Sequence, residues 1–142
     1  MTKNAVYRRS FTLVEMLVVV TIIALIAGLV LPNVMGGLEK SKRDTAKAQI
    51  KVLDDAVLSY YLDMKEHPRT LDDLVKSPGS SAKWNGPYLK SGAIPKDPWG
   101  NQYLFEQPGQ DGRSYDIYSY GKDGTSGGQK NDADIGSWYE EE

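Results

Sequence analysis

The chain contains no cysteine and a single histidine among its 142 residues. The lack of cysteine excludes a disulfide framework, a thiolate zinc site and a cysteine nucleophile. His67 stands beside a proline without an evident partner, so we expect a surface or capping position and no hydrolase triad. Strong charge is also missing, because the formal net charge is -2 and the basic residues are scattered. Nucleic acid is therefore not an expected partner.

Apolar residues are concentrated in residues 11–35, where Glu15 is the only ionisable side chain. A helix over this run is long enough to cross a hydrocarbon core roughly 30 Å thick. Lys3, Arg8 and Arg9 precede the run, and the positive-inside bias keeps such a segment in the cytoplasm. The sequence predicts a single-pass membrane helix with the following domain on the outer side, which in a bacterium is the periplasmic side of the inner membrane.

A cleavable secretory signal peptide is the alternative interpretation of a basic segment followed by an apolar one. The apolar run here exceeds the usual length of about 7 to 15 residues, and no small-x-small cleavage site closes it. Pro32 lies within the run and removes one helical hydrogen bond, so we expect a bend or local loosening there.

Glu15 lies one turn into the apolar run, where a lone carboxylate is unfavourable. The cost is about 2.5 to 3.5 kcal/mol at the centre of a membrane helix and less near an interface. Two interpretations stay open from spacing alone. Either the carboxylate remains hydrated near the headgroups, or a positively charged partner compensates for its charge.

Residues 36–66 are expected to continue the helix with an amphipathic pattern. Apolar side chains recur at steps of three and four, at Ala46, Ile50, Leu53, Val57, Tyr60 or Tyr61, and Met64. This stripe should pack on a globular domain. The helix is expected to stop at His67, and Thr70 with Asp73 resembles a capping box that starts a short helix.

Residues 67–142 are expected to form a small periplasmic β domain. Residues 103–105 and 115–118 are aromatic and β-branched runs joined by a segment rich in glycine and proline, which predicts an antiparallel hairpin. A third strand is expected around residues 135–138. The predicted fold class is therefore α+β, a long N-terminal helix, transmembrane and then amphipathic, packed on a small antiparallel sheet.

The sequence Arg-Arg-Ser-Phe-Thr-Leu-Val-Glu-Met before the apolar run resembles the leader of type IV pilins and pseudopilins. In that family, prepilin peptidase cuts before the phenylalanine and methylates its amino group. The resemblance implies that residues 1–10 are a cleaved cytoplasmic leader, with cleavage between Ser10 and Phe11 and N-methylation of Phe11. It also implies that Glu15 pairs with the terminal amine of a neighbouring subunit during assembly. Ser10 replaces the usual glycine, which bears on the efficiency of cleavage.

Several downstream runs are distinctive: Trp84-Asn85-Gly86-Pro87-Tyr88-Leu89, residues 95–103, Pro108-Gly109, Tyr115-Asp116-Ile117, and residues 121–124 with 131–135. Together they resemble the major pseudopilins of type II secretion, the general secretion pathway protein G family. The resemblance implies a structural subunit rather than an enzyme, which polymerises into a periplasmic pseudopilus that helps export folded proteins through the outer membrane. The implied partners are further copies of the chain, prepilin peptidase, minor pseudopilins, an inner-membrane assembly platform and membrane lipid.

The segment from Tyr120 to Asp134 contains three aspartates among several glycines. Oxygen donors on a flexible loop, without histidine or cysteine, suit a hard cation such as calcium. The spacing is not that of an EF-hand, and aspartate and glycine also form solvated turns, so both interpretations stay open on the residues alone. The family binds calcium here, and the resemblance implies the carboxylates of Asp123, Asp132 and Asp134 with the backbone carbonyl of Tyr120.

Two alternative functions differ in testable ways. A type IV pilus or competence pilin shares the leader and the helix, but many such pilins close their C-terminal region with a disulfide, which this chain cannot form. A monomeric, membrane-anchored calcium-binding protein is the other alternative. It would not crosslink into a ladder after extraction in detergent.

Overall fold

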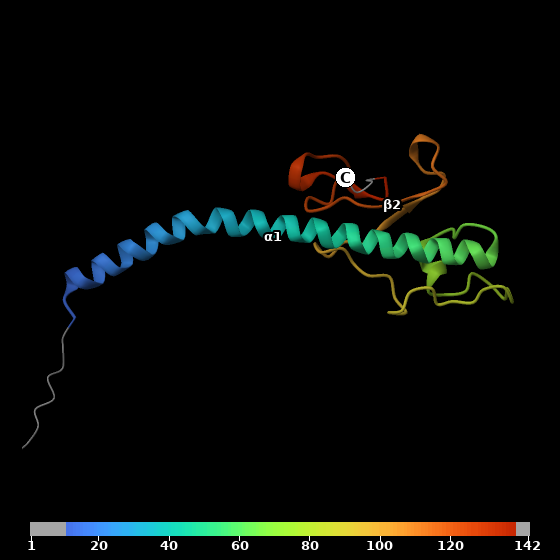
Figure 1. The fold of residues 1–142 in the computed structure, drawn as a ribbon, viewed down its shortest axis with the longest axis horizontal. Helices are drawn as coiled ribbons and strands as arrows, with labels where there is room; N and C mark the ends of the chain where they lie inside the picture. Colours follow the sequence, from blue (N-terminus) through green and yellow to red (C-terminus); the bar gives the residue numbers. More distant parts are fainter. Residues whose placement is uncertain (1–10, 139–142) are drawn as a thin grey trace, which may run out of the picture. The chain divides into compact units, whose positions relative to one another are not determined.

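The computed structural model describes residues 11–138, apart from the side chains of residues 29–35. The predicted leader, including Ser10, lies outside the described residues. The chain divides into two units, Met1–Leu38 and Glu39–Glu142. Helix α1, Leu13–Met64, contributes to both units (Figure 1).

In the first unit, α1 carries exposed apolar side chains on all of its faces. Their exposed fractions between Leu13 and Ile26 run from 44% at Val19 to 81% at Leu13. A helix that is apolar all round needs an apolar environment or apolar partners. Among the residues that the structure describes, no helix is both long and apolar enough to span a membrane. The predicted span includes residues 29–35, whose side chains lie outside the described part.

In the second unit, α1 packs the predicted apolar stripe into the core. The side chains that are at most 3% exposed are those of Ala46, Ile50, Leu53, Ala56, Val57 and Tyr60. Tyr60 rather than Tyr61 belongs to the stripe, because Tyr61 is 41% exposed. The helix ends at Met64, two residues before the predicted end, and Lys65 takes a left-handed backbone conformation with φ of 63°.

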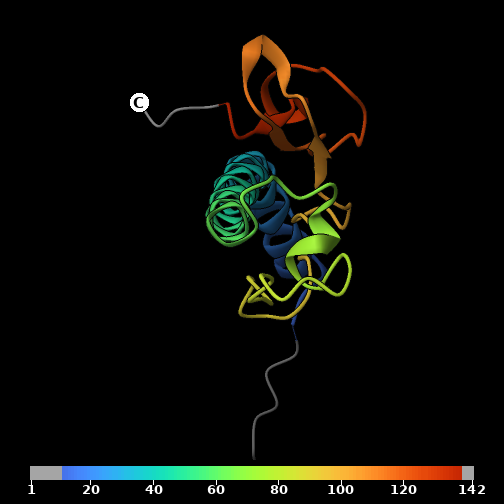
Figure 2. The ribbon, with the colours of Figure 1, turned by 90° about the vertical axis from the view of Figure 1, so that its right-hand side faces the viewer.

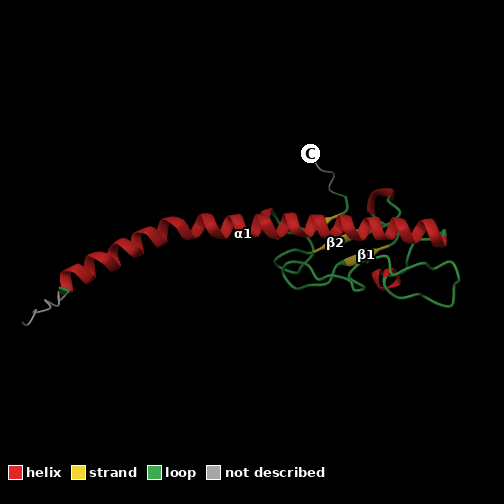
Figure 3. Ribbon diagram, turned by 60° about the horizontal axis from the view of Figure 1, so that its bottom comes forward, coloured by secondary structure: helices red, strands yellow, loops and turns green. Residues whose placement is uncertain are grey.

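Three short antiparallel strands form the predicted sheet in the order β1-β2-β3. Their bounds are Leu104–Glu106 for β1, Asp116–Ser119 for β2 and Ile135–Gly136 for β3. Leu104 pairs with Tyr118, and Ser119 pairs with Ile135. The first two strands begin one residue later than predicted, and the third is shorter. Most of the remaining unit is loop (Figure 3).

The short helix predicted after Thr70 is the 3-10 helix η1, Leu71–Leu74. The carboxylate of Asp73 accepts hydrogen bonds from the backbone amides of Arg69 at 2.9 Å and Thr70 at 3.3 Å. Asp73 thus reaches back to the helix start, as a capping box requires. Two further 3-10 turns, η2 at Gln110–Gly112 and η3 at Lys130–Asp132, lie in loops.

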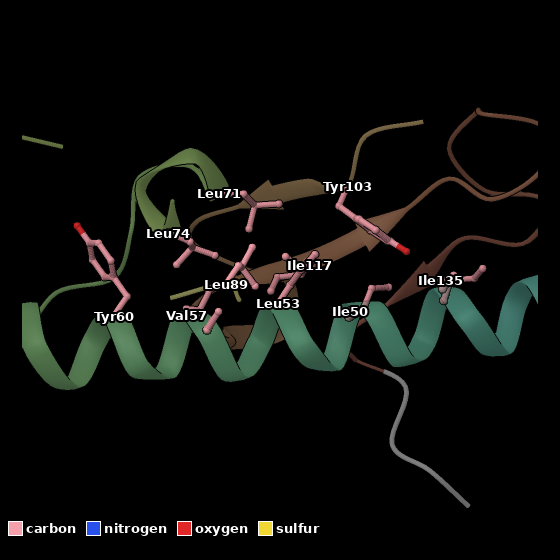
Figure 4. Close-up of a cluster of buried hydrophobic side chains, with 12 residues drawn as sticks. Ile50, Leu53, Val57, Tyr60, Leu71, Leu74, Leu89, Tyr103, Ile117 and Ile135 are labelled. Carbon is pink, nitrogen blue, oxygen red and sulfur yellow. The ribbon is translucent and has the colours of Figure 1, made fainter. Parts of the chain in front are cut away.

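One hydrophobic core joins the helix to the rest of the second unit. The stripe of α1 faces Leu71 and Leu74 of η1, Ile117 of β2 and Ile135 of β3, together with Leu89 and Tyr103 from loops (Figure 4). The end-on view shows the sheet and the segment of residues 65–100 covering one side of this part of α1 (Figure 2). The helix is thus an integral part of the small domain, whose core would be incomplete without it.

Candidate functional site

The helix begins with a capping box between Thr12 and Glu15. The Thr12 hydroxyl accepts a hydrogen bond from the Glu15 amide at 3.2 Å, and the Thr12 amide donates to Glu15 Oε2 at 3.5 Å. A carboxylate in the first turn also interacts favourably with the helix dipole. The capping role of Thr12 and Glu15 was not predicted from the sequence, although threonine followed three residues later by glutamate is the signature of a capping box. Phe11, directly before the cap, is 72% exposed.

The segment predicted to bind calcium runs from Tyr120 to Asp134, and its loop, residues 121–134, begins after β2 at a point fixed by hydrogen bonds. The Ser119 hydroxyl donates to Asp97 Oδ2 at 2.6 Å and accepts from the Gly121 amide at 3.0 Å. Asp97 is buried and also accepts hydrogen bonds from the amides of Trp99 and Asn101. The turn at residues 97–101 therefore holds the start of the loop in place.

Tyr120 lies at this start, with its ring 5.5 Å from the ring of Tyr118. Burial, together with the hydrogen bond and the charge of Tyr120, raises the pKa of Tyr118 to about 12. The phenol of Tyr118 is therefore neutral at physiological pH and acts as a packing and hydrogen-bonding group. The expected role of the Tyr120 carbonyl as a calcium ligand stays a prediction.

Asp123 forms a local turn within the loop. Its Oδ1 accepts a hydrogen bond from the Thr125 amide at 3.2 Å, and its Oδ2 accepts from the Thr125 hydroxyl at 3.0 Å. Asp132 is exposed, and its amide donates to the Gln129 carbonyl at 3.1 Å. Within residues 11–138, no three acidic, histidine or cysteine side chains gather into a metal-binding group. The structure therefore does not bring the three predicted carboxylates together.

Asp134 closes the loop and is the predicted ligand that best fits a cation. Its amide donates to the Gly127 carbonyl at 3.2 Å, and its Oδ2 accepts from the Gly127 amide at 2.9 Å. Its Oδ1 is buried and has no hydrogen-bond partner among the described residues. A buried carboxylate oxygen without a partner is unfavourable, and a hard cation is one group that satisfies it.

Two residues of α1 that the sequence did not single out contact the loop. Arg43 Nη1 donates to the Ala133 carbonyl at 2.6 Å and lies 3.4 Å from the Asn131 carbonyl. Glu39 accepts a hydrogen bond from Trp99 Nε1 at 3.2 Å and lies 3.7 Å from Lys122 Nζ. No sequence signal points to these contacts, because charged residues at four-residue spacing are ordinary on an amphipathic helix.

Comparison with known proteins finds family matches for both the N-terminal segment and the rest of the chain. The prokaryotic N-terminal methylation motif matches residues 7–31, and the family described as type II secretion system (T2SS), protein G matches residues 33–138. The type II secretion system core protein G of Pseudomonas aeruginosa is 44% identical over 135 residues, covering 90% of this chain and 93% of that protein. The core protein G of Vibrio cholerae is 40% identical over 134 residues, covering 90% of each.

A solved structure agrees in fold. The crystal structure of the major pseudopilin from the type 2 secretion system of enterohaemorrhagic Escherichia coli matches with a TM-score of 0.59 and 31% identity, covering 73% of this chain and 88% of that chain. The match confirms the predicted α+β, pilin-like fold. It also confirms the resemblance stated from the sequence. This chain belongs to the type II secretion system protein G family, a family of structural pseudopilin subunits and not of enzymes.

Proposed function

We propose that this chain is the major subunit of a type II secretion pseudopilus, a periplasmic filament that helps export folded proteins through the outer membrane. The proposal depends mainly on the part of α1 that belongs to the first unit. Its large apolar side chains are exposed on all faces in the single chain, and the methylation motif covers the same segment. Such a helix is suited to lie first in lipid and then among identical helices, where its apolar surface stays out of water.

Processing is expected to precede assembly. Prepilin peptidase would cut between Ser10 and Phe11 and methylate the new amino group of Phe11. The cut exposes a positively charged amine four residues before Glu15. Glu15 of one subunit would then neutralise the Phe11 amine of another in a poorly hydrated place. Membrane insertion gives a cytoplasmic leader and a periplasmic second unit.

The other partners follow from assembly. Subunits leave the membrane and join the filament, which requires an inner-membrane platform and an energy source. Minor pseudopilins would cap the tip. These partners are proposed from membership of the protein G family.

Calcium binding by the loop of residues 121–134 is also proposed. Support comes from the buried Oδ1 of Asp134, which has no hydrogen-bond partner among the described residues, and from a segment, Tyr120 to Asp134, that contains oxygen donors but no histidine or cysteine. Asp123, Asp132 and the Tyr120 carbonyl would complete the ligand set. Calcium would supply a divalent charge that satisfies loop oxygens and links the two ends of the loop.

Intact-mass measurement and a secretion assay test the proposed function together. The gene is deleted in its host and restored as wild type or as Ser10→Gly. We expect export to fail in the deletion strain, with exoproteins retained in the periplasm, and to return with both forms. The membrane-purified protein should lack residues 1–10 and carry one added methyl group.

Two results would contradict the proposal. A mature mass that retains residues 1–10 in cells with active prepilin peptidase would show that Ser10 blocks processing, and Ser10→Gly should then restore it. Unchanged export in the deletion strain would exclude a role as the major subunit.

A further inference from the structure

The two ends of the loop of residues 121–134 meet beside α1. Gly121 opens the loop with a φ of 71°, and a Cβ atom built on it would lie 3.4 Å from the Ala133 carbonyl oxygen and 3.9 Å from that of Asn131. These two carbonyl oxygens belong to the far end of the loop. They are also the two groups that Arg43 Nη1 contacts, at 2.6 and 3.4 Å. One cationic nitrogen therefore lies where the loop closes.

The chemistry of this contact is that of a cation among oxygen donors. An arginine guanidinium keeps its charge at all physiological pH values and has no acceptor atom. Within residues 11–138, Arg43 forms no ion pair with a carboxylate. Its positive charge is therefore directed at backbone carbonyls, in hydrogen bonds that the charge strengthens.

Carbonyl oxygens are also ligands that calcium accepts. Asp134 follows Ala133 directly, and its Oδ1 is the buried oxygen that has no partner. The Arg43 guanidinium contacts residues 131 and 133, and the proposed calcium would bind residue 134, so both cations would interact with the same short segment. Glu39, one turn before Arg43, holds the opening end of the loop through Lys122, with 3.7 Å between Oε1 and Nζ.

We propose that Arg43 is an internal cation that holds the loop closed when no metal is bound, and that a divalent cation takes over this role when it binds. The proposal rests on the calcium binding proposed above. It gives the second unit two closed forms of the loop, one held by the protein and one by metal. The loop would then stay ordered in a subunit that has not yet met calcium.

Hydrogen exchange of the full-length chain in detergent tests this proposal. The variants are Arg43→Gln, Arg43→Lys and the matched control Lys51→Gln, which removes one exposed positive charge from the same helix. Each is measured with calcium and with chelator. The readout is exchange of the Gly127, Asp132 and Asp134 amides, which donate the hydrogen bonds of the loop.

In chelator, we expect these amides to exchange roughly tenfold faster in Arg43→Gln than in wild type, which is the effect of losing one charge-assisted hydrogen bond. Lys51→Gln should match wild type, and Arg43→Lys should fall between. In calcium, the difference between Arg43→Gln and wild type should shrink, because the metal then holds the loop.

The outcomes separate the two proposals. Equal exchange of Arg43→Gln and wild type in chelator would overturn the role of Arg43. A difference that is equally large in calcium would show that arginine and metal act independently, which overturns the replacement of one by the other. If the exchange rates of the loop amides are the same with calcium and with chelator in every variant, the proposed calcium site is overturned. The measurements in chelator still decide whether Arg43 holds the loop closed.

Discussion

At the scale of single residues, Asp116 carries a buried charge that the fold compensates. It is fully buried at the start of β2, and its carboxylate accepts hydrogen bonds from Arg113 Nε at 2.6 Å, Arg113 Nη2 at 3.2 Å and the Gln110 amide at 2.7 Å. The Arg113 hydrogen bonds hold the pKa of Asp116 below its usual value, against the opposing effect of burial. The same guanidinium lies 5.6 Å from the centre of the Trp138 ring. Asp116 therefore organises the hairpin and the segment after β3.

We expect Asp116→Asn to lower the free energy of unfolding by about 1.5 to 3 kcal/mol at pH 7, because hydrogen bonds to a charged group are lost inside the protein. The depressed pKa stabilises the fold fully above the unfolded value of 3.8, and this stabilisation is lost as the pH falls through the folded value. Denaturation at pH 7 and pH 3 should show the difference between wild type and variant shrinking in acid. Asp111→Asn is the control, since that side chain is 87% exposed; an equal loss in both variants would refute the argument.

Glu15 has two possible uses that substitution can separate. We expect Glu15→Ala to leave membrane insertion intact and to impair polymerisation, because the carboxylate would no longer neutralise a neighbouring Phe11 amine. Thr12→Ala removes the capping hydroxyl and keeps the carboxylate, so it should still polymerise. Filament yield after overexpression is the measurement. Normal filaments with Glu15→Ala, or an equal defect with Thr12→Ala, would assign Glu15 a role confined to its own helix.

At the scale of elements, α1 in the second unit presents two faces with different tasks. Leu53 is fully buried in the core, whereas Leu58 is 54% exposed on the same helix. The difference follows from helix geometry, because residues five apart point in nearly opposite directions. The two leucines therefore form a matched pair for testing the core.

We expect Leu53→Ala to lower the free energy of unfolding by about 2 to 5 kcal/mol, through lost burial and a cavity. Leu58→Ala should change it by less than about 0.5 kcal/mol, because a surface side chain is truncated without a cavity. Chemical denaturation of the detergent-solubilised monomer measures both. Similar losses in the two variants would mean that α1 does not pack against the domain as described.

At the scale of the whole molecule, calcium is expected to stabilise the second unit by mass action. A cation that binds only the folded chain at 100 times its dissociation constant adds about 2.7 kcal/mol. The midpoint of thermal unfolding in calcium should therefore lie above that in chelator. Asp134→Asn should lose most of this shift, because its Oδ1 is the oxygen that lacks a partner.

The matching controls are Asp123→Ala and Asp111→Asn. Asp123→Ala should also reduce the calcium shift, while Asp111→Asn, in another loop, should keep it. Superimposable melting curves of the wild type in calcium and in chelator would show that the proposed calcium site does not exist. If calcium raised the midpoint of Asp134→Asn and of Asp123→Ala as much as that of the wild type, these two carboxylates would not be ligands.

The sequence by itself determined the features that depend on local order. The helix, its apolar stripe at Ala46, Ile50, Leu53 and Val57, and the hairpin followed from periodicity and turn residues, which act over a few positions. The leader motif is likewise contiguous, and its resemblance to the methylation motif is confirmed for residues 7–31. Such signals survive in the sequence because neighbours in the chain create them.

Tertiary structure alone decided the contacts between distant segments. Arg43 reaches carbonyls 88 and 90 residues further along the chain, and Tyr115 donates to Asp54, 61 residues earlier. The choice of Tyr60 over Tyr61 and the partners of Asp134 were settled in the same way. These contacts depend on where irregular loops return to α1. Loops lack the regular side-chain spacing of helices and strands, and every residue has a backbone carbonyl. The sequence pattern therefore does not predict which carbonyls make these contacts.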